Sequence, residues 1–227
     1  MVVGTMGSRL RIPDEVRDRL GDRVRGLVGP GGTETRGAPR RPELRSDGES
    51  NGVRVVGYAS TYDQPYPIFG GPEAGGFMEI IAPGAFDKSV RERKDDVRFL
   101  VNHEGAALAR TKPATMTLTS DEIGLLVDAE LDRNNPEVVK LESAMRRGDM
   151  DQMSFAFEVL RQEWSPDWSQ RRITEVRLFD VSVVTYPAND QTMALIGADA
   201  DRPKPDGPAV RGLGVELARA QWYRLAG

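Results

Sequence analysis

The chain has 227 residues, 39% of them hydrophobic, and a formal net charge of −4, which suits one soluble domain of ordinary size with flanking segments, or at most two small domains. The mild acidity argues against nucleic-acid binding by the whole chain, no stretch approaches the ~18 uninterrupted apolar residues of a membrane helix, and the N-terminus lacks the pattern of a secretory signal. The absence of cysteine excludes a disulfide scaffold, an active-site thiol and a thiolate metal site, and favours work in a cytoplasm.

The N-terminal part of the chain differs in composition from the rest. Residues 1–50 carry ten arginines and eight acidic residues, which makes them slightly basic on an acidic body; we expect a solvated tail, with specific docking as the alternative. Apolar residues recur at helical spacing over 12–28, which predicts a marginal helix that needs a packing partner. Residues 29–52 are rich in glycine and proline, as linkers are. We therefore expect residues 1–52 to be a largely disordered arm and linker.

The globular domain is expected over residues 53–198. Its first half has the apolar patterns of strands, one short helix over 85–94, and a hairpin; the predicted strands cover 53–62, 77–81, 97–102, 115–119 and 123–131. A longer helix is predicted over 136–147, because Asn135 can cap it, Pro136 suits the first helical position and Gly148 can end it.

The second half of the domain contains the two clearest strands, over 152–160 and 173–185, joined by a turn near 164–168. Residues 199–227 are expected to form a tail with a short helix over 215–225. Strands outnumber helices, and the two do not alternate regularly along the chain. This order predicts an α+β fold, with a mainly antiparallel, barrel-like β core and a few surrounding helices.

The chain has one histidine, His103, which directly follows the predicted strand over 97–102. Histidine is the side chain best suited to accept and return a proton near neutral pH. On a later strand Phe155 and Phe157 share one face, which leaves Ser154 and Ala156 on the other. Small side chains on that second face leave room for a substrate or an imidazole. If the protein is a serine hydrolase, His103 must be its imidazole base.

Asp180 is an unusual residue because it lies inside an apolar strand. An ionised carboxylate there is costly unless it is paired, and a histidine partner would satisfy it and be oriented by it. The alternatives are that Asp180 pairs with Arg171 or Arg172, or caps a turn. Likewise Ser154 could be a structural serine and His103 a surface residue.

Five short blocks, in this order, resemble the HK97-type phage prohead (capsid maturation) proteases: GYAS (57–60), EIIAPGAF (79–86), LVNHE (100–104), RGDMDQMSFAF (147–157) and DVSVVTYPA (180–188). The resemblance covers residues 53–195. It implies a serine protease whose fold is similar to that of the herpesvirus capsid-assembly proteases.

By position, the resemblance implies that Ser154 is the nucleophile and His103 the base. The acidic third member of the site is less definite. Asp180 fits the order of the related viral enzymes, Glu79 is the second choice, and Asp63 the third. The donors that stabilise the oxyanion are not identified by the resemblance.

The segment Arg146-Arg147-Gly148 is a candidate region for those oxyanion donors, although positive charge at a helix C-terminus explains its arginines equally well. No cofactor is expected. One histidine and no cysteine cannot build a zinc centre of the usual kind, and the glycine-rich residues 70–76 lack the lysine and following helix of a phosphate-binding loop.

The resemblance also implies partners and a place of action. Members of the family cut the major capsid protein or its scaffold segment inside the immature shell, in the host bacterial cytoplasm, and often cut themselves. The related viral enzymes act as dimers. Two alternatives remain: an inactive capsid-assembly or scaffold factor that keeps the protease fold, and an unrelated α+β binding domain.

Overall fold

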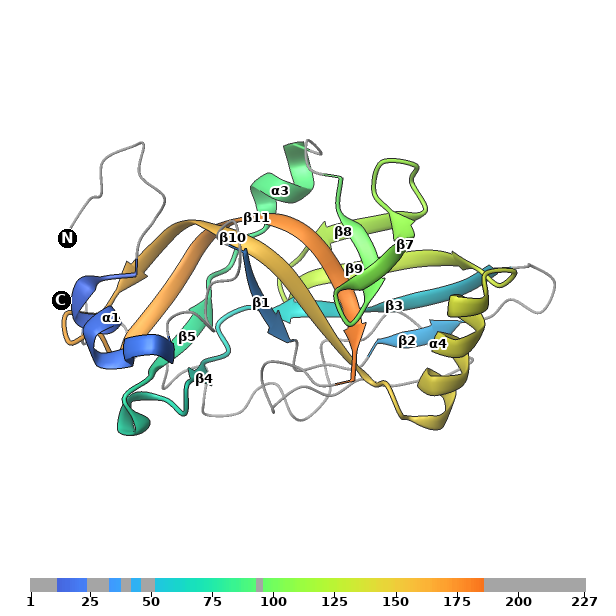
Figure 1. Ribbon diagram of the computed structural model, residues 1–227. Coiled ribbons are helices and arrows are strands. Elements are labelled where there is room, and N and C mark those ends of the chain that lie inside the picture. The colour runs from blue at the N-terminus through green and yellow to red at the C-terminus, as the bar shows by residue number, and fades with distance from the viewer. Residues whose placement is uncertain (1–11, 24–32, 38–41, 46–51, 93–95, 186–227) are drawn as a thin grey trace.

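Two β-sheets that share one hydrophobic core make up the protein in this computed structural model (Figure 1). The structure describes residues 12–23, 33–37, 42–45, 52–92 and 96–185. The sequence-based predictions for the C-terminal tail and its short helix fall outside these ranges.

The larger sheet is organised around a long antiparallel hairpin. Its two strands are β10 (Gln152–Trp164) and β11 (Gln170–Val184), which pair with each other along most of their length. The outer edge of β10 pairs with β1 (Thr33–Gly37), also antiparallel. The segment from the N-terminal arm is therefore the strand at this edge of the sheet (Figure 1).

The other edge of β11 is divided between two strand pairs. β5 (Phe77–Ile81) pairs parallel with the beginning of β11 and carries β4 (Tyr66–Ile68) on its far side. β6 (Arg98–Val101) pairs parallel with the end of β11 and continues as a hairpin into β7 (Glu104–Arg110).

The smaller sheet has four antiparallel strands, in the order β2 (Glu43–Arg45), β3 (Gly52–Thr61), β9 (Gly124–Asp132) and β8 (Met116–Ser120). The β8–β9 hairpin matches the predicted one. Apolar side chains from both sheets, including Val55, Val127, Phe155 and Phe157, form one buried cluster. The fold is thus α+β and mostly strands, as expected.

One detail of the expected architecture is wrong. In the part of the chain that the structure describes, neither sheet closes on itself, since the larger ends at β1 and β4 and the smaller at β2 and β8, so the strands form no barrel. The pairing is mainly antiparallel, as expected, and the exceptions are the parallel contacts of β11 with β5 and β6. A strand as long as β11 can hold two separate partners along one edge, and this divides the sheet instead of closing it.

The prediction of a linker over 29–52 also differs from the structure, where β1 and β2 both form within that stretch. These short segments have little apolar pattern of their own. Their backbone groups are satisfied by strands that lie far away in the sequence, β10 for β1 and β3 for β2, and such non-local pairing leaves no periodic signal.

Within the described ranges, the α-helices that cover the sheets are α1 (Asp14–Leu20), α3 (Asp87–Glu92) and α4 (Pro136–Arg147). α4 confirms its prediction, with the Asn135 side chain accepting a hydrogen bond from the Glu137 amide and Gly148 left-handed at φ 79°. α1 buries Val16 and Leu20, as the predicted stripe requires. No helix in the described part of the chain has the length and apolar character to span a bilayer.

Candidate active site

His103 lies in a tight turn between two strands. Val101 of β6 pairs with Glu104 of β7, which leaves Asn102 and His103 as a two-residue connection. Both have left-handed backbones, with φ values of 52° and 60°, as a two-residue hairpin of matching twist requires. The sequence correctly indicated the end of a strand here, but not this backbone conformation, which is uncommon for histidine.

Asn102 ties this turn to the end of β11. Its side-chain Oδ1 accepts a hydrogen bond from the Thr185 amide at 2.9 Å, and its own amide donates to the Val183 carbonyl at 3.0 Å. Asparagine also tolerates the left-handed backbone better than most residues. Asn102 is therefore a positioning residue, because it holds the turn that presents the imidazole.

We expect Asn102→Ala to lower the free energy of unfolding by about 1–3 kcal/mol, because it strains a left-handed position and removes the bond to Thr185. Asn102→Gly keeps the backbone conformation and should lose less. Urea unfolding of the two variants compares these contributions. If both variants lose the same free energy of unfolding, strain in the left-handed backbone does not contribute to the effect of Asn102→Ala.

Ser154 lies on β10, on the face opposite the apolar core. Its neighbours Met153 and Phe155 point into the core, whereas Ser154 and Ala156 pair across the strand with Ser182 and Asp180 of β11. Ser154 and Ala156 thus share the strand face opposite Phe155 and Phe157, as the sequence pattern predicted. Ser154 itself is 2% exposed.

A β-bulge in β11 brings Asp180 to the same face as Ser154. Ala156 pairs with Asp180 but Phe157 pairs with Leu178, so Phe179 is an extra residue. Before the bulge Leu178 faces the core, and after it Val181 does. The inserted residue thus reverses which side chains face inward. Without it, Asp180 would lie on the same face as Leu178, in the apolar core.

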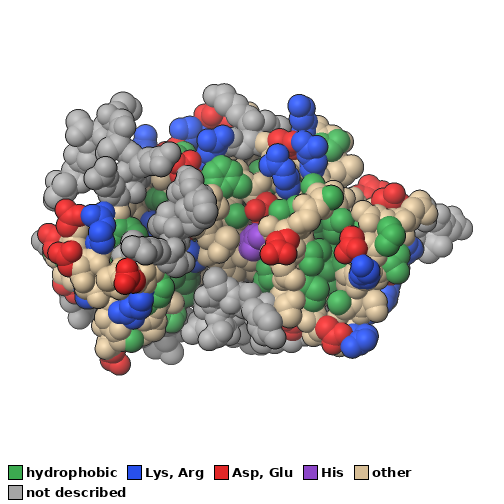
Figure 2. Space-filling model, in the orientation of Figure 1, with side chains coloured by type: hydrophobic (Ala, Val, Ile, Leu, Met, Phe, Trp, Pro, Cys, Tyr) green, Lys and Arg blue, Asp and Glu red, His purple; other side chains and the backbone are tan. Residues whose placement is uncertain are grey.

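The three predicted site residues meet at this face. The His103 Nδ1 atom is 2.6 Å from Asp180 Oδ1, and its Nε2 atom is 2.8 Å from Ser154 Oγ. The three side chains come from the β6–β7 turn, β10 and β11. The His103 side chain keeps 22% of its exposure, and it is the purple group on the face shown in Figure 2. The imidazole is therefore partly exposed, whereas Ser154 beside it is buried.

Ser182 is a fourth member of this cluster, which sequence reasoning did not single out. Its hydroxyl donates to Asp180 Oδ1 at 3.0 Å, accepts from the His103 amide at 3.2 Å, and lies 3.2 Å from His103 Nδ1. It is fully buried. Its place two residues after Asp180, hence on the same strand face, was the signal that could have found it.

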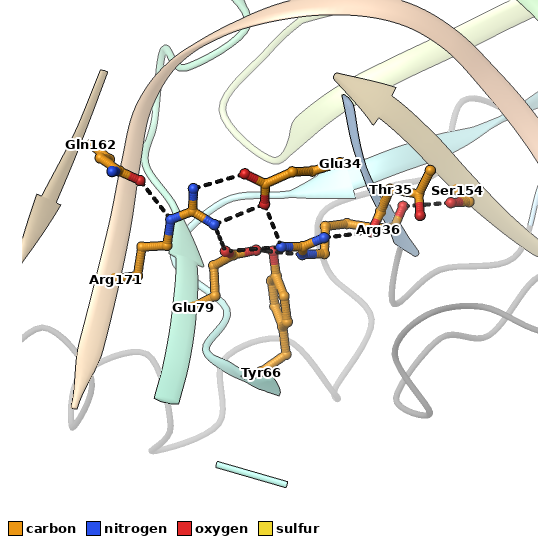
Figure 3. Close-up of polar contacts among 8 residues, drawn as sticks. All are labelled: Glu34, Thr35, Arg36, Tyr66, Glu79, Ser154, Gln162 and Arg171. Carbon is orange, nitrogen blue, oxygen red and sulfur yellow. Dashed lines mark hydrogen bonds and ion pairs between the residues drawn. The ribbon is translucent and has the colours of Figure 1, made fainter. Parts of the chain in front are cut away.

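Glu79, the second choice for the acidic member, lies in a different cluster (Figure 3). Its carboxylate accepts hydrogen bonds from Arg36 Nε at 2.6 Å, Arg171 Nη1 at 2.8 Å and the Tyr66 hydroxyl at 2.5 Å. Glu34 completes the group. We refer to Glu34, Arg36, Glu79 and Arg171 as the charged cluster. The structure brings Asp180 to His103 and does not bring Glu79 there.

The charged cluster is buried, and its members keep one another ionised. Burial by itself lowers the pKa of the Arg36 guanidinium, but the carboxylates of Glu79 and Glu34 outweigh it and raise that pKa. Burial raises the pKa of the Glu79 carboxyl, but Arg36 and Arg171 outweigh it and hold that pKa below its ordinary value. Removing one member would leave a buried charge uncompensated, at a cost of roughly 3–5 kcal/mol.

The remaining candidates have other partners. Asp63, the third choice for the acidic member, forms an ion pair with Arg172 at 3.0 Å. Arg146 donates to Glu142 at 2.8 Å and Arg147 pairs with Asp149 at 2.7 Å. Among the residues that the structure describes, no group of three or more acidic or histidine side chains is arranged to hold a metal ion.

Comparison with known proteins agrees with the resemblance in the sequence. The chain is 29% identical over 150 residues to the prohead protease of Enterobacteria phage HK97, and it spans 62% of that relative's length in an alignment that covers 66% of this chain. The structure of the bacteriophage T4 capsid assembly protease is similar over 68% of this chain and 96% of that chain, at 14% identity and a TM-score of 0.41. A family model described as caudovirus prohead serine protease matches residues 41–202, so the chain belongs to that family.

Proposed function

We propose that this protein is a serine endopeptidase that processes the major capsid protein, or its scaffold segment, during prohead maturation. The observation that carries the proposal is the contact chain from Ser154 Oγ to His103 Nε2 at 2.8 Å and from His103 Nδ1 to Asp180 Oδ1 at 2.6 Å. Membership of the prohead protease family supports the same activity.

In the proposed reaction, Ser154 Oγ attacks the scissile carbonyl carbon while His103 Nε2 accepts its proton. Asp180 accepts a hydrogen bond from Nδ1–H, which fixes the tautomer and stabilises the imidazolium that forms. His103 then gives the proton to the leaving amine, and water hydrolyses the ester on Ser154. Ser182 supports this arrangement by donating to the same carboxylate oxygen of Asp180.

Backbone amides near the nucleophile are proposed to stabilise the oxyanion, as in other acyl-transfer enzymes. The segment that follows α4, up to the start of β10, remains our candidate for them. Arg146 and Arg147 have acidic partners of their own, so any contribution from this segment would come from its backbone.

We further propose that the protein acts inside the assembling procapsid, in the cytoplasm of the host bacterium, and that it also cuts its own N-terminal arm. Self-association as a dimer is proposed from the related viral enzymes. We propose no cofactor, because the side chains supply the groups that an acyl transfer needs. Ser154 is the nucleophile, His103 is both the base and the acid, and Asp180 orients His103.

Co-expression with the cognate major capsid protein tests the proposal. We expect intact mass spectrometry to find truncated capsid protein with the wild-type chain and full-length capsid protein with Ser154→Ala. Ser169→Ala, at a half-buried serine in the turn between β10 and β11, is the matched control and should leave truncation intact. Assembled shells without truncation in any sample would favour the inactive assembly factor instead.

A further inference from the structure

A segment of the N-terminal arm lies against the nucleophile. β1 adds antiparallel to β10 at the edge of the larger sheet, with Gly37 paired opposite Ser154. Proteins commonly bind an extended peptide in this way, as an extra strand on an exposed sheet edge. β1 therefore occupies the position in which a peptide could reach Ser154 along β10.

The peptide bond after Arg36 is the one that faces the serine. Ser154 Oγ donates a hydrogen bond to the Arg36 carbonyl oxygen at 2.8 Å. Because a C=O bond is about 1.2 Å long, the carbonyl carbon lies within about 4 Å of Oγ. A hydroxyl has a single proton, so this carbonyl competes with His103 Nε2 for it. Attack requires the peptide group to turn its oxygen away.

Glu34 and Arg36 both point into the protein from this strand, as residues two apart in a strand do. Each is 4% exposed. Arg36 donates to Glu79 at 2.6 Å and 3.2 Å, and Arg171 donates to Glu34 at 2.8 Å and 2.9 Å. The two charged side chains of β1 thus each meet an opposite charge from the body of the enzyme (Figure 3).

From these contacts we propose that Glu79 and Arg171 are specificity-determining residues, and that β1 is a substrate strand bound within the same chain. Glu79 recognises a basic residue whose carbonyl faces Ser154. Arg171 recognises an acidic residue two positions earlier. The proposed substrate class is an extended peptide with three consecutive residues: an acidic residue, a residue of any type, and a basic residue. The peptide is cut after the basic residue.

The two body residues are suited to this role because they form a complementary pair by themselves. Glu79 lies on β5 and Arg171 on β11, and the two are 2.8 Å apart. A strand bearing both charges adds no net charge to the buried site, whereas a strand with only one would leave a charge uncompensated. Recognition thus depends on the spacing of two charges.

Applied to the chain itself, the reaction cleaves the bond between Arg36 and Gly37. A bond forms between Ser154 Oγ and the Arg36 carbonyl carbon, the C–N bond to Gly37 breaks, and the serine proton passes through His103 to the Gly37 nitrogen. Water then hydrolyses the ester, which leaves a carboxylate on Arg36 and returns the proton to Ser154. Release of residues 1–36 frees the edge of β10.

This inference rests on the proposed function, and one experiment separates the two. The full chain is co-expressed with its cognate capsid protein, and both are followed by intact mass. We expect a Ser154-dependent product that begins at Gly37. Arg36→Gln and Glu79→Gln should each slow its formation about 10- to 100-fold, since each weakens hydrogen bonds between charged groups. Arg36→Lys should retain more activity than Arg36→Gln.

Thr35→Gln is the matched control, because Thr35 lies between the two charged residues and on the opposite face of β1. It should leave the rate unchanged. The double variant Arg36→Gln/Glu79→Gln should lose less rate than the sum of the single losses, because both changes remove the Arg36–Glu79 contact and the double variant leaves Glu34 and Arg171 as a balanced pair. Under a purely structural role of Glu79, the loss of rate in each variant would follow its loss of unfolding temperature.

Three other results would overturn the inference. In the first, the capsid protein is cut in a Ser154-dependent way but the chain itself is never cut after Arg36. This would show that β1 is not a substrate, and the proposed function would still hold. In the second, the chain is cut before Gly37 at a rate that Arg36→Gln and Glu79→Gln do not change. This would disprove recognition of the two charges but not cleavage of β1. If neither protein is cut in a Ser154-dependent way, the proposed function fails and this inference with it.

Discussion

Ser154→Ala and His103→Ala are each expected to lower the rate constant for capsid-protein cleavage by about 10⁶-fold, the loss typical when the nucleophile or base of a serine protease is removed. The reason is that both act in one step: the Ser154 hydroxyl is a weak nucleophile until His103, 2.8 Å away, takes its proton. Cleavage is measured as the appearance of truncated capsid protein by intact mass.

Neither substitution should affect the fold strongly, since both side chains lie outside the apolar core cluster. Thermal unfolding of each variant checks this, with Ser169→Ala as the control for cleavage. A Ser154→Ala protein that cleaves within tenfold of the wild-type rate would mean that the nucleophile is elsewhere. Loss of activity in Ser154→Ala alone would mean that His103 is not the base.

Asp180→Asn is expected to lower the same rate constant by about 10⁴-fold, the order found for the equivalent change in a serine protease triad. Asparagine has nearly the shape of aspartate, but its amide can donate to Nδ1. That stabilises the tautomer with the proton on Nε2, which cannot accept the serine proton. The change therefore removes the base without removing its ring.

Asp128→Asn is the matched control for this change, because Asp128 is partly exposed and pairs with Arg54 on the smaller sheet. It should retain the wild-type rate. Ser182→Ala should cost far less than Asp180→Asn, since Ser182 acts only by supporting the Asp180 carboxylate. A loss under tenfold in Asp180→Asn would assign the orientation of His103 to another group.

Much of the candidate site could be predicted because its residues carry local signals. His103 is the only histidine, Ser154 lies opposite large apolar residues on its strand, and Asp180 is an acid in an apolar strand. The bulge at Phe179 was harder to see, yet it decides the site, because it turns Asp180 out of the core. Its signal in the sequence was that the inward-facing apolar residues Leu178 and Val181 are three positions apart, which breaks the two-residue period of a strand.

The features that could not be predicted depend on partners distant in the sequence. β1 looks like a linker, since its segment Thr-Glu-Thr-Arg-Gly has no apolar alternation. Its two buried charges are satisfied by each other and by Glu79 and Arg171, which lie far away in the sequence. β7, rich in alanine and glycine, forms a strand because β6 pairs with it. The barrel expectation failed for the same reason: the strand pattern does not reveal that β11 divides its edge between β5 and β6.

The most direct test of the site uses the fact that His103 is the only histidine in the chain. In protein labelled with ¹⁵N-histidine, every imidazole NMR signal comes from this residue, so its tautomer can be determined without assignment. Neutral His103 is predicted to carry its proton on Nδ1, facing Asp180, with Nε2 free to accept from Ser154. In Asp180→Asn the proton should move to Nε2. A proton on Nε2 in the wild-type protein, or a tautomer unchanged by Asp180→Asn, would contradict the assignment of His103 as the base of a Ser154–His103–Asp180 triad.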